Sequence, residues 1–237
     1  MKRSRALSLF LITGIFAVAM GFLEAIVVVY LRELYYPLGF SFPLKVFSPH
    51  LYGIELIREA ATLVMLLMVG ILAGKSRTDK FAFFLYSFGV WDIVYYIALK
   101  LFLNWPEGFL TWDLLFLIPV TWIGPVIAPV ICSVTMIILA GVLVLLRRKR
   151  NRPLMDSVTW ILLVSGSFLV FLSFIRDYTL LLLRNGLLRD LQNLFYNDTF
   201  RQVIESFVPE RFDWVLFGAG EILLIAAIAR IVWKQRR

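Results

Sequence analysis

The chain has 237 residues, of which 61% are hydrophobic and only 17% charged, and it carries a formal net charge of +8. Soluble domains of average composition contain about 45–50% apolar and about 25% charged residues. These departures, with apolar runs longer than a soluble core helix needs, exclude a soluble enzyme, a disordered tail, a disulfide-rich secreted scaffold and a nucleic-acid-binding module. The sequence predicts an all-α, polytopic helical membrane protein that forms one integral membrane domain over residues 1–237.

Six apolar stretches are long enough to cross the hydrocarbon layer, which takes about 20 residues as a helix. The first follows a basic start and contains Ala17-Val-Ala19, a pattern also found at signal-peptide cleavage sites. Because its apolar run continues unbroken to Leu31, we expect a first span instead of a cleaved signal. The predicted spans are residues 7–31, 51–73, 81–103, 124–146, 158–178 and 213–233.

The fourth apolar run, residues 114–146, is too long for one straight crossing. Proline removes a backbone donor and clashes with the preceding turn, so a regular helix is not expected where prolines cluster. Two interpretations stay open: a short re-entrant segment near 114–121 before a full span from about residue 124, or one kinked helix with a proline break within 114–130. The interrupting residues are Pro119, Gly124, Pro125 and Pro129.

Residues 179–212 form the largest segment outside the predicted spans, on the outer side. Apolar residues recur in it at helical spacing opposite polar ones, which is typical of a helix lying in the membrane interface. The same pattern suits a lid packed over the helical bundle. The recurring residues are Leu187, Leu188, Leu191, Leu194 and Phe195.

Basic residues cluster at the same side of every predicted span. Lys and Arg are enriched in cytoplasmic segments, so both termini are predicted to be cytoplasmic and the protein to be a multi-pass protein of the cell's inner (plasma) membrane. The lipid bilayer, with its anionic headgroups, accounts for the excess positive charge, and no nucleic-acid partner is expected. The 14 of 24 basic residues on this side are Lys2, Arg3, Arg5, Lys75, Arg77, Lys80, Arg147, Arg148, Lys149, Arg150, Arg152, Lys234, Arg236 and Arg237.

The chain has one cysteine, Cys132, and one histidine, His50. Haem, copper and zinc sites commonly use several imidazole or thiolate ligands, so we expect none of these cofactors. A monovalent or divalent cation would have to be held by carboxylates.

Ionisable side chains inside the predicted spans point to a site, because each costs at least about 2.5–3.5 kcal/mol near the membrane centre. Counting 1.5 Å of rise per residue places Glu24, Glu59 and Glu221 roughly 10–12 Å below the outer surface, with Asp92 deeper and Glu55 shallower. The candidate ligand- or proton-binding residues are Glu24, Glu55, Arg58, Glu59, Asp92, Tyr95 and Glu221, with Asp113, Arg176 and Asp177 as secondary candidates. A cation would be held by Glu24, Glu59, Asp92 and Glu221.

Two features of this cluster can also be explained by a role in helix packing and stability instead of ligand binding. Arg58 follows Glu55 by three residues and precedes Glu59 by one, so it would pair with either glutamate as a structural ion pair. Gly21 and Gly220, beside two of the glutamates, would either let helices approach closely or leave space for a ligand. Even so, five carboxylates face a single arginine, and the excess must be protonated or balanced by a group that the chain does not supply.

Three functions fit this pattern, and the sequence does not decide whether the chain is an enzyme. The first is a small membrane transporter or binding protein for a solute or cation, with a carboxylate-rich site in the outer half of the membrane. The second is a membrane-embedded enzyme that acts on a lipid or isoprenoid by carboxylate acid–base chemistry. The third is an accessory subunit whose charges pair with the helices of partner subunits.

Overall fold

The computed structural model describes residues 3–146, 155–187 and 198–236. Six of its helices are long and apolar enough to cross a membrane, which confirms the prediction of a multi-span helical protein. A seventh, short helix and two strands complete the described elements. The helices are α1 (Arg3–Tyr35), α2 (Pro49–Ala73), α3 (Arg77–Leu103), α4 (Ile127–Leu145), α5 (Ser157–Arg184), α6 (Asp198–Ile204) and α7 (Trp214–Arg236), and the strands are β1 (Trp112–Phe116) and β2 (Trp122–Pro125).

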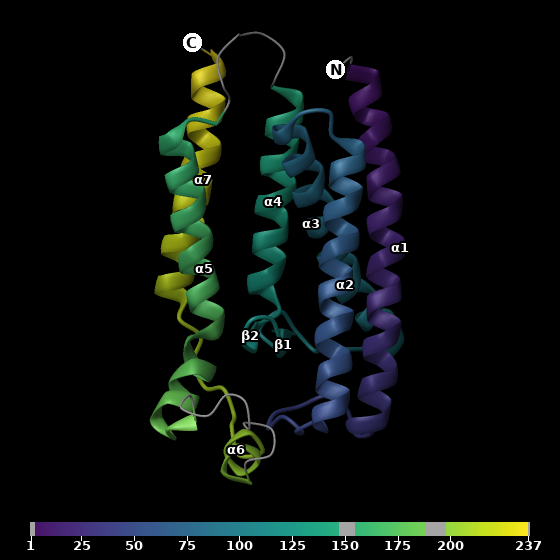
Figure 1. Ribbon diagram of the computed structural model, residues 1–237, viewed down its shortest axis with the longest axis vertical. Coiled ribbons are helices and arrows are strands. Elements are labelled where there is room, and N and C mark those ends of the chain that lie inside the picture. The colour runs from purple at the N-terminus through teal and green to yellow at the C-terminus, as the bar shows by residue number, and fades with distance from the viewer. Residues whose placement is uncertain (1–2, 147–154, 188–197, 237) are drawn as a thin grey trace.

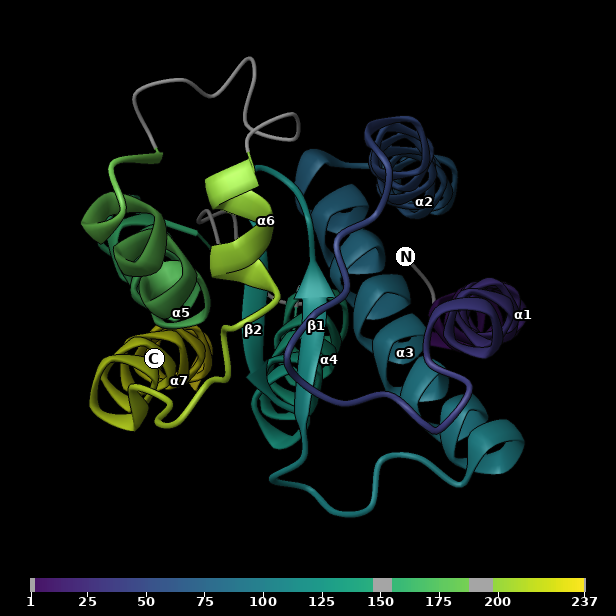
Figure 2. The ribbon, with the colours of Figure 1, turned by 90° about the horizontal axis from the view of Figure 1, so that it is seen from below.

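The six long helices run side by side, and the start of α1 lies at the same end of the bundle as the end of α7 (Figure 1). Helix α3 packs against α1, α2 and α4, whereas α5 packs mainly against α7. Viewed from the opposite end, the two strands and α6 lie between the α5–α7 pair and the α1–α3 group (Figure 2). This end of the bundle, where the strands and α6 lie, is called the hairpin end below.

Glycines set the closest helix contacts. A Cβ atom at Gly166 of α5 would lie 2.9 Å from the carbonyl oxygen of Gly220 of α7, and one at Gly220 would lie 2.8 Å from the carbonyl oxygen of Gly166. Similarly, a Cβ at Gly21 of α1 would lie 2.8 Å from the carbonyl oxygen of Trp91 of α3. Such distances are too short for any larger residue, so Gly21 and Gly220 serve helix packing.

Residues 112–125 form an antiparallel hairpin, which the sequence analysis did not predict. Asp113 of β1 lies opposite Gly124 of β2, and α4 begins just after the second strand. The expectation of one kinked helix through this region is therefore wrong, and the fold is not purely helical. A hairpin pairs the backbone groups of a segment whose prolines interrupt helical hydrogen bonding.

Helix α6 packs over the hairpin end of the bundle. Phe200 and Ile204 are buried, with 3% and 4% of their surface exposed. They belong to one apolar cluster with Leu44, Tyr178 and Leu182. This part of the predicted amphipathic segment therefore covers the bundle. Residues 188–197, which hold most of its apolar stripe, lie outside the described residues. The basic stretch 147–152 lies outside them as well.

Asp156 connects the start of α5 to the end of α7. Its carboxylate accepts a hydrogen bond from the backbone N–H of Thr159, at 3.0 Å, and thereby caps α5. It also accepts one from Arg230 Nη2, at 2.8 Å, and pairs with Lys234. Hydrogen bonds from Arg230 and Lys234 hold the pKa of Asp156 well below its usual range.

The Asp156→Asn variant should have a lower unfolding temperature than the wild type at pH 7, because an amide caps the helix but does not pair with two cations. The depressed pKa means that this stabilisation is complete above about pH 4, the pKa of unfolded Asp, and is lost as the pH falls toward the folded value. Thermal unfolding in detergent should show the difference at pH 7 and a smaller one at pH 3. A difference of equal size at both pH values would contradict this assignment.

Candidate functional site

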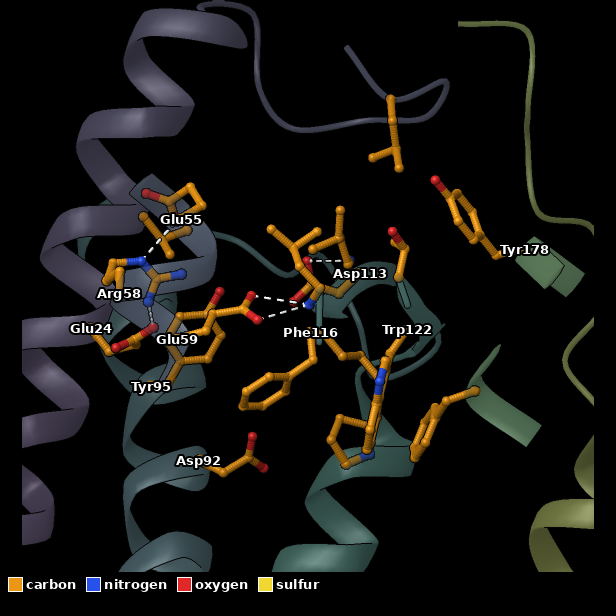
Figure 3. Close-up of a pocket in the computed structure, with 18 of the residues that line it drawn as sticks. Glu24, Glu55, Arg58, Glu59, Asp92, Tyr95, Asp113, Phe116, Trp122 and Tyr178 are labelled. Atoms are coloured by element: carbon orange, nitrogen blue, oxygen red, sulfur yellow. Dashed lines mark hydrogen bonds and ion pairs between the residues drawn. The ribbon is translucent and has the colours of Figure 1, made fainter. Parts of the chain in front are cut away.

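A cavity of about 390 Å³ lies between helices α1–α3 on one side and helices α4 and α5 on the other, toward the hairpin end. Residues of α1, α2 and α3 line one side, and residues of α4 and α5 line the other. The hairpin, α6 and the segment between α1 and α2 supply the lining toward the hairpin end. Part of this lining is drawn in Figure 3. Of the predicted site residues, seven line this cavity: Glu24, Glu55, Arg58, Glu59, Asp92, Tyr95 and Asp113.

Arg58 forms the centre of a charged cluster on the α1–α2 side of the cavity. Its Nε lies 2.7 Å from Glu55 Oε2, and its guanidinium also pairs with Glu24 of α1. Glu24 additionally accepts a hydrogen bond from Thr62 Oγ1 at 3.0 Å. Arg58 therefore pairs with two carboxylates, and of the two glutamates on its own helix its printed partner is Glu55.

Glu59 points the other way, toward the hairpin. Both of its carboxyl oxygens accept hydrogen bonds from the backbone N–H of Leu117, at 2.9 and 3.1 Å. The residue is 5% exposed, and no described residue forms an ion pair with it. Glu59 thus fixes the turn of the hairpin against α2 while its carboxyl group lines the cavity.

Asp92 of α3 lies at the end of the cavity away from α6. Ser133 Oγ of α4 donates a hydrogen bond to Asp92 Oδ2 at 2.7 Å. Within the described part of the chain, Asp92 has no ion-pair partner, and none of the hydrogen bonds reaches Oδ1. Its carboxyl group points toward the ring of Phe116 and the open part of the cavity (Figure 3).

Aromatic rings form a continuous surface across the cavity. The ring of Phe116, on the hairpin, lies 6.3 Å from that of Phe88 and 5.8 Å from that of Trp122, measured between centroids. Trp122 in turn stacks on Phe174 of α5 at 5.9 Å. The hairpin therefore joins the aromatic residues of α3 to those of α5, and the lining is mostly apolar.

A second charged pair lies toward the hairpin end. Arg32 Nη2 lies 2.9 Å from Asp113 Oδ1, and Tyr96 donates a hydrogen bond to Asp113 Oδ2 at 3.2 Å. The guanidinium carbon of Arg32 sits 3.7 Å from the ring centre of Trp105 and 4.4 Å from that of Phe40. Sequence analysis missed Arg32 because it directly follows the predicted end of the first span, whereas α1 continues to Tyr35.

The other predicted residues lie away from the cavity lining. Glu221 of α7 accepts a hydrogen bond from Thr135 Oγ1 of α4 at 2.8 Å, and neither residue is among the lining residues. Arg176 pairs with Asp213 at 2.8 Å, with about half of the arginine exposed, and Asp177 is not among the lining residues. Depth along the membrane grouped Glu221 with Glu24 and Glu59 in the sequence analysis, but only the two other glutamates line the cavity.

The four carboxylates proposed to hold a cation have different partners: Arg58, a backbone N–H, Ser133 and Thr135. Within residues 3–146, 155–187 and 198–236, no group of three His, Cys, Asp or Glu side chains is placed to hold a metal ion.

None of the comparisons with protein-family models, curated proteins and solved structures gives a match to this chain.

Proposed function

We propose that the protein is a membrane-embedded enzyme that takes a lipid-like molecule from the bilayer into the aromatic cavity and exchanges a proton with it. One observation carries the proposal: Glu59 and Asp92, two carboxyl groups without a described ion-pair partner, line a cavity that is otherwise mostly aromatic and aliphatic. Apolar linings with a few placed polar groups are typical of small-molecule sites. Buried carboxyl groups in such sites act as general acids and bases.

The arrangement of α2 and α5 supports entry from the bilayer. Both helices line the cavity, yet they make no extended packing contact with each other. Ser167 of α5 is exposed and also belongs to the lining, so it lies where the cavity meets the outside of the bundle. Toward the opposite end, an apolar cluster that includes Phe83, Leu143 and Ile231 closes the bundle core.

Charge supports an orientation with both termini in the cytoplasm. The basic stretch that runs from the end of α2 into the first turn of α3, with Lys75, Arg77 and Lys80, lies at the end opposite the hairpin (Figure 1). Under the positive-inside rule that end is cytoplasmic, which puts the cavity in the outer half of a plasma membrane.

A binding protein or transporter for a cation or cationic solute is the second candidate. The two unpaired carboxyl groups favour it, because a bound cation would balance them. An accessory subunit has less support, since Arg32 and Arg58 find their partners within this chain.

Ligand-dependent thermal stability separates the two candidates. A ligand present at 100 times its dissociation constant stabilises a protein by about 2.7 kcal/mol. We expect squalene or geranylgeraniol to raise the unfolding temperature of the detergent-solubilised protein, and sodium, calcium or tetraethylammonium ions to leave it unchanged. A rise with the cations alone would favour the transporter and contradict the enzyme.

The Ser167→Trp variant should lose this response, because an indole at position 167, an exposed position that also lines the cavity, would block entry there. Ser165→Trp is the matched control. Ser165 lies two residues earlier on α5 and is also an exposed serine, but it does not line the cavity. The measurement is the squalene-induced shift in unfolding temperature of each variant. Equal shifts for the two variants would show that ligands do not enter at this point.

A further inference from the structure

We infer that the molecule taken into the cavity is an unsaturated isoprenoid, and that Asp92 is the acid that protonates one of its carbon–carbon double bonds. This inference rests on the proposed function and names its substrate class and its proton donor. Three features carry it: the surroundings of Asp92, the rings around it, and the pairing of the cavity's arginines.

The surroundings of Asp92 suit a neutral carboxylic acid. The residue is 8% exposed, and no cation among the described residues pairs with it. Burial without a counter-charge disfavours a carboxylate. Because Ser133 donates to Oδ2 at 2.7 Å, that oxygen acts as the acceptor, which leaves Oδ1 to carry the proton toward the cavity.

The rings beside Asp92 suit a positive charge on carbon. Protonation of an alkene leaves a carbocation, and the faces of aromatic rings attract cations. Phe116 packs against Phe88, Trp91 and Trp122, with centroid separations of 6.3, 6.1 and 5.8 Å. A chain threaded between the hairpin and α3 would therefore lie against ring faces along its length.

Other lipids fit less well. Arg58 pairs with two glutamates and Arg32 with Asp113, so Lys45 is the one lining cation without a described ion-pair partner. Lys45 lies on the segment between α1 and α2, over the ring of Tyr36, so a phosphate bound to it would sit at the hairpin end, away from Asp92. A saturated chain offers Asp92 no atom to protonate. A polyene needs only apolar walls, an acid and a base.

The step is redox-neutral. The Asp92 Oδ1–H bond breaks, and the π electrons of one double bond form a new C–H bond, which leaves the positive charge on the second carbon. A neighbouring double bond then attacks this carbon to form a C–C bond, or an adjacent C–H bond gives up its proton. The final proton goes back to the carboxylate of Asp92 that the first step formed, so Asp92 is regenerated and the product is an isomer of the substrate.

The test incubates the purified full-length protein with squalene or geranylgeraniol in D₂O and measures deuterium in isomeric products by mass spectrometry. We expect the wild type to incorporate deuterium and Asp92→Asn to be slower by at least about a hundredfold, the usual contribution of a general acid. Asp177→Asn, an Asp→Asn change on α5 outside the cavity lining, should match the wild type. Squalane, the saturated counterpart of squalene, should gain no deuterium.

Binding separates this inference from the function on which it rests. Asp92→Asn should keep the squalene-induced rise in unfolding temperature, because the amide still accepts the hydrogen bond from Ser133. A rise in wild type and variant without deuterium incorporation in either would overturn the inference and leave lipid binding intact. Equal incorporation by wild type and Asp92→Asn would overturn the role of Asp92, and no rise with either polyene would overturn both proposals.

The ring at position 116 gives an independent readout. Removing one cation–ring interaction, worth about 0.5–2 kcal/mol, corresponds to a rate lowered about twofold to thirtyfold. Phe116→Leu should show this loss, whereas Phe116→Tyr, which keeps the ring, should incorporate deuterium at a rate close to that of the wild type. Equal rates for the two variants would contradict stabilisation of a carbocation by this ring.

Discussion

The Arg32→Met variant should be less stable than the wild type by about 3–5 kcal/mol, the usual penalty for removing one partner of a buried ion pair. Asp113 is 1% exposed, so loss of the guanidinium leaves a buried carboxylate with only Tyr96 and a backbone N–H to solvate it. The stacking on Trp105 and Phe40 is lost as well. Unfolding in mixed micelles by SDS titration measures the free energy directly.

Arg176→Met is the matched control for this prediction. Arg176 also forms an Arg–Asp pair, with Asp213 at 2.8 Å, but about half of its side chain is exposed. Exposed pairs contribute about 0–1 kcal/mol, so this variant should remain close to the wild type. Similar losses in the two variants would contradict the view that Arg32 and Asp113 hold the hairpin end of the bundle together.

The Arg58→Gln variant should lose a comparable 3–5 kcal/mol, because both Glu24 and Glu55 then lack a cation. Neutralising the carboxylates as well, in the triple variant Glu24→Gln, Glu55→Gln, Arg58→Gln, should recover most of the loss, since replacing a whole buried charged cluster is far less costly than breaking it. The same SDS titration compares the three proteins. A triple variant less stable than Arg58→Gln would show that the two glutamates do not depend on Arg58.

The six spans were predictable because the bilayer leaves an apolar segment of about 20 residues few alternatives to a helix, the structure that pairs its own backbone groups. The ends of the helices were less predictable. The first helix continues to Tyr35 and the fifth to Arg184, beyond the apolar runs that ended at residues 31 and 178. By contrast, the start of α2 follows from local chemistry, with Ser48 as its cap and Pro49 in its first turn.

The hairpin was not predictable, because contacts distant in sequence hold it. Leu117 donates its N–H to Glu59, 58 residues earlier in the chain, and Asp113 pairs with Arg32, 81 residues earlier. Neither partnership leaves a local pattern. The prolines showed only that a regular helix would be interrupted in this region.

For the site, the sequence predicts a depth for each candidate but not the direction in which its side chain faces. Counting residues from the span ends grouped Glu24, Glu59 and Asp92, and all three line the cavity. The same count included Glu221, whose carboxylate binds Thr135 instead. Which face a helix turns toward its neighbours depends on packing, such as the contact between Gly166 and Gly220, and the hydropathy of a nearly uniform apolar helix does not define that face.

A density map of the protein in lipid nanodiscs with added squalene would show whether the cavity holds an apolar molecule beside Asp92. The predicted result is an elongated density between Trp122 and Phe116 that approaches Asp92 to about 3–3.5 Å, the separation of reacting atoms. A compact density with oxygen ligands at roughly 2.0–2.6 Å would instead indicate a bound cation and contradict the proposed isoprenoid site. A cavity closed by paired side chains, with no ligand density, would contradict it as well.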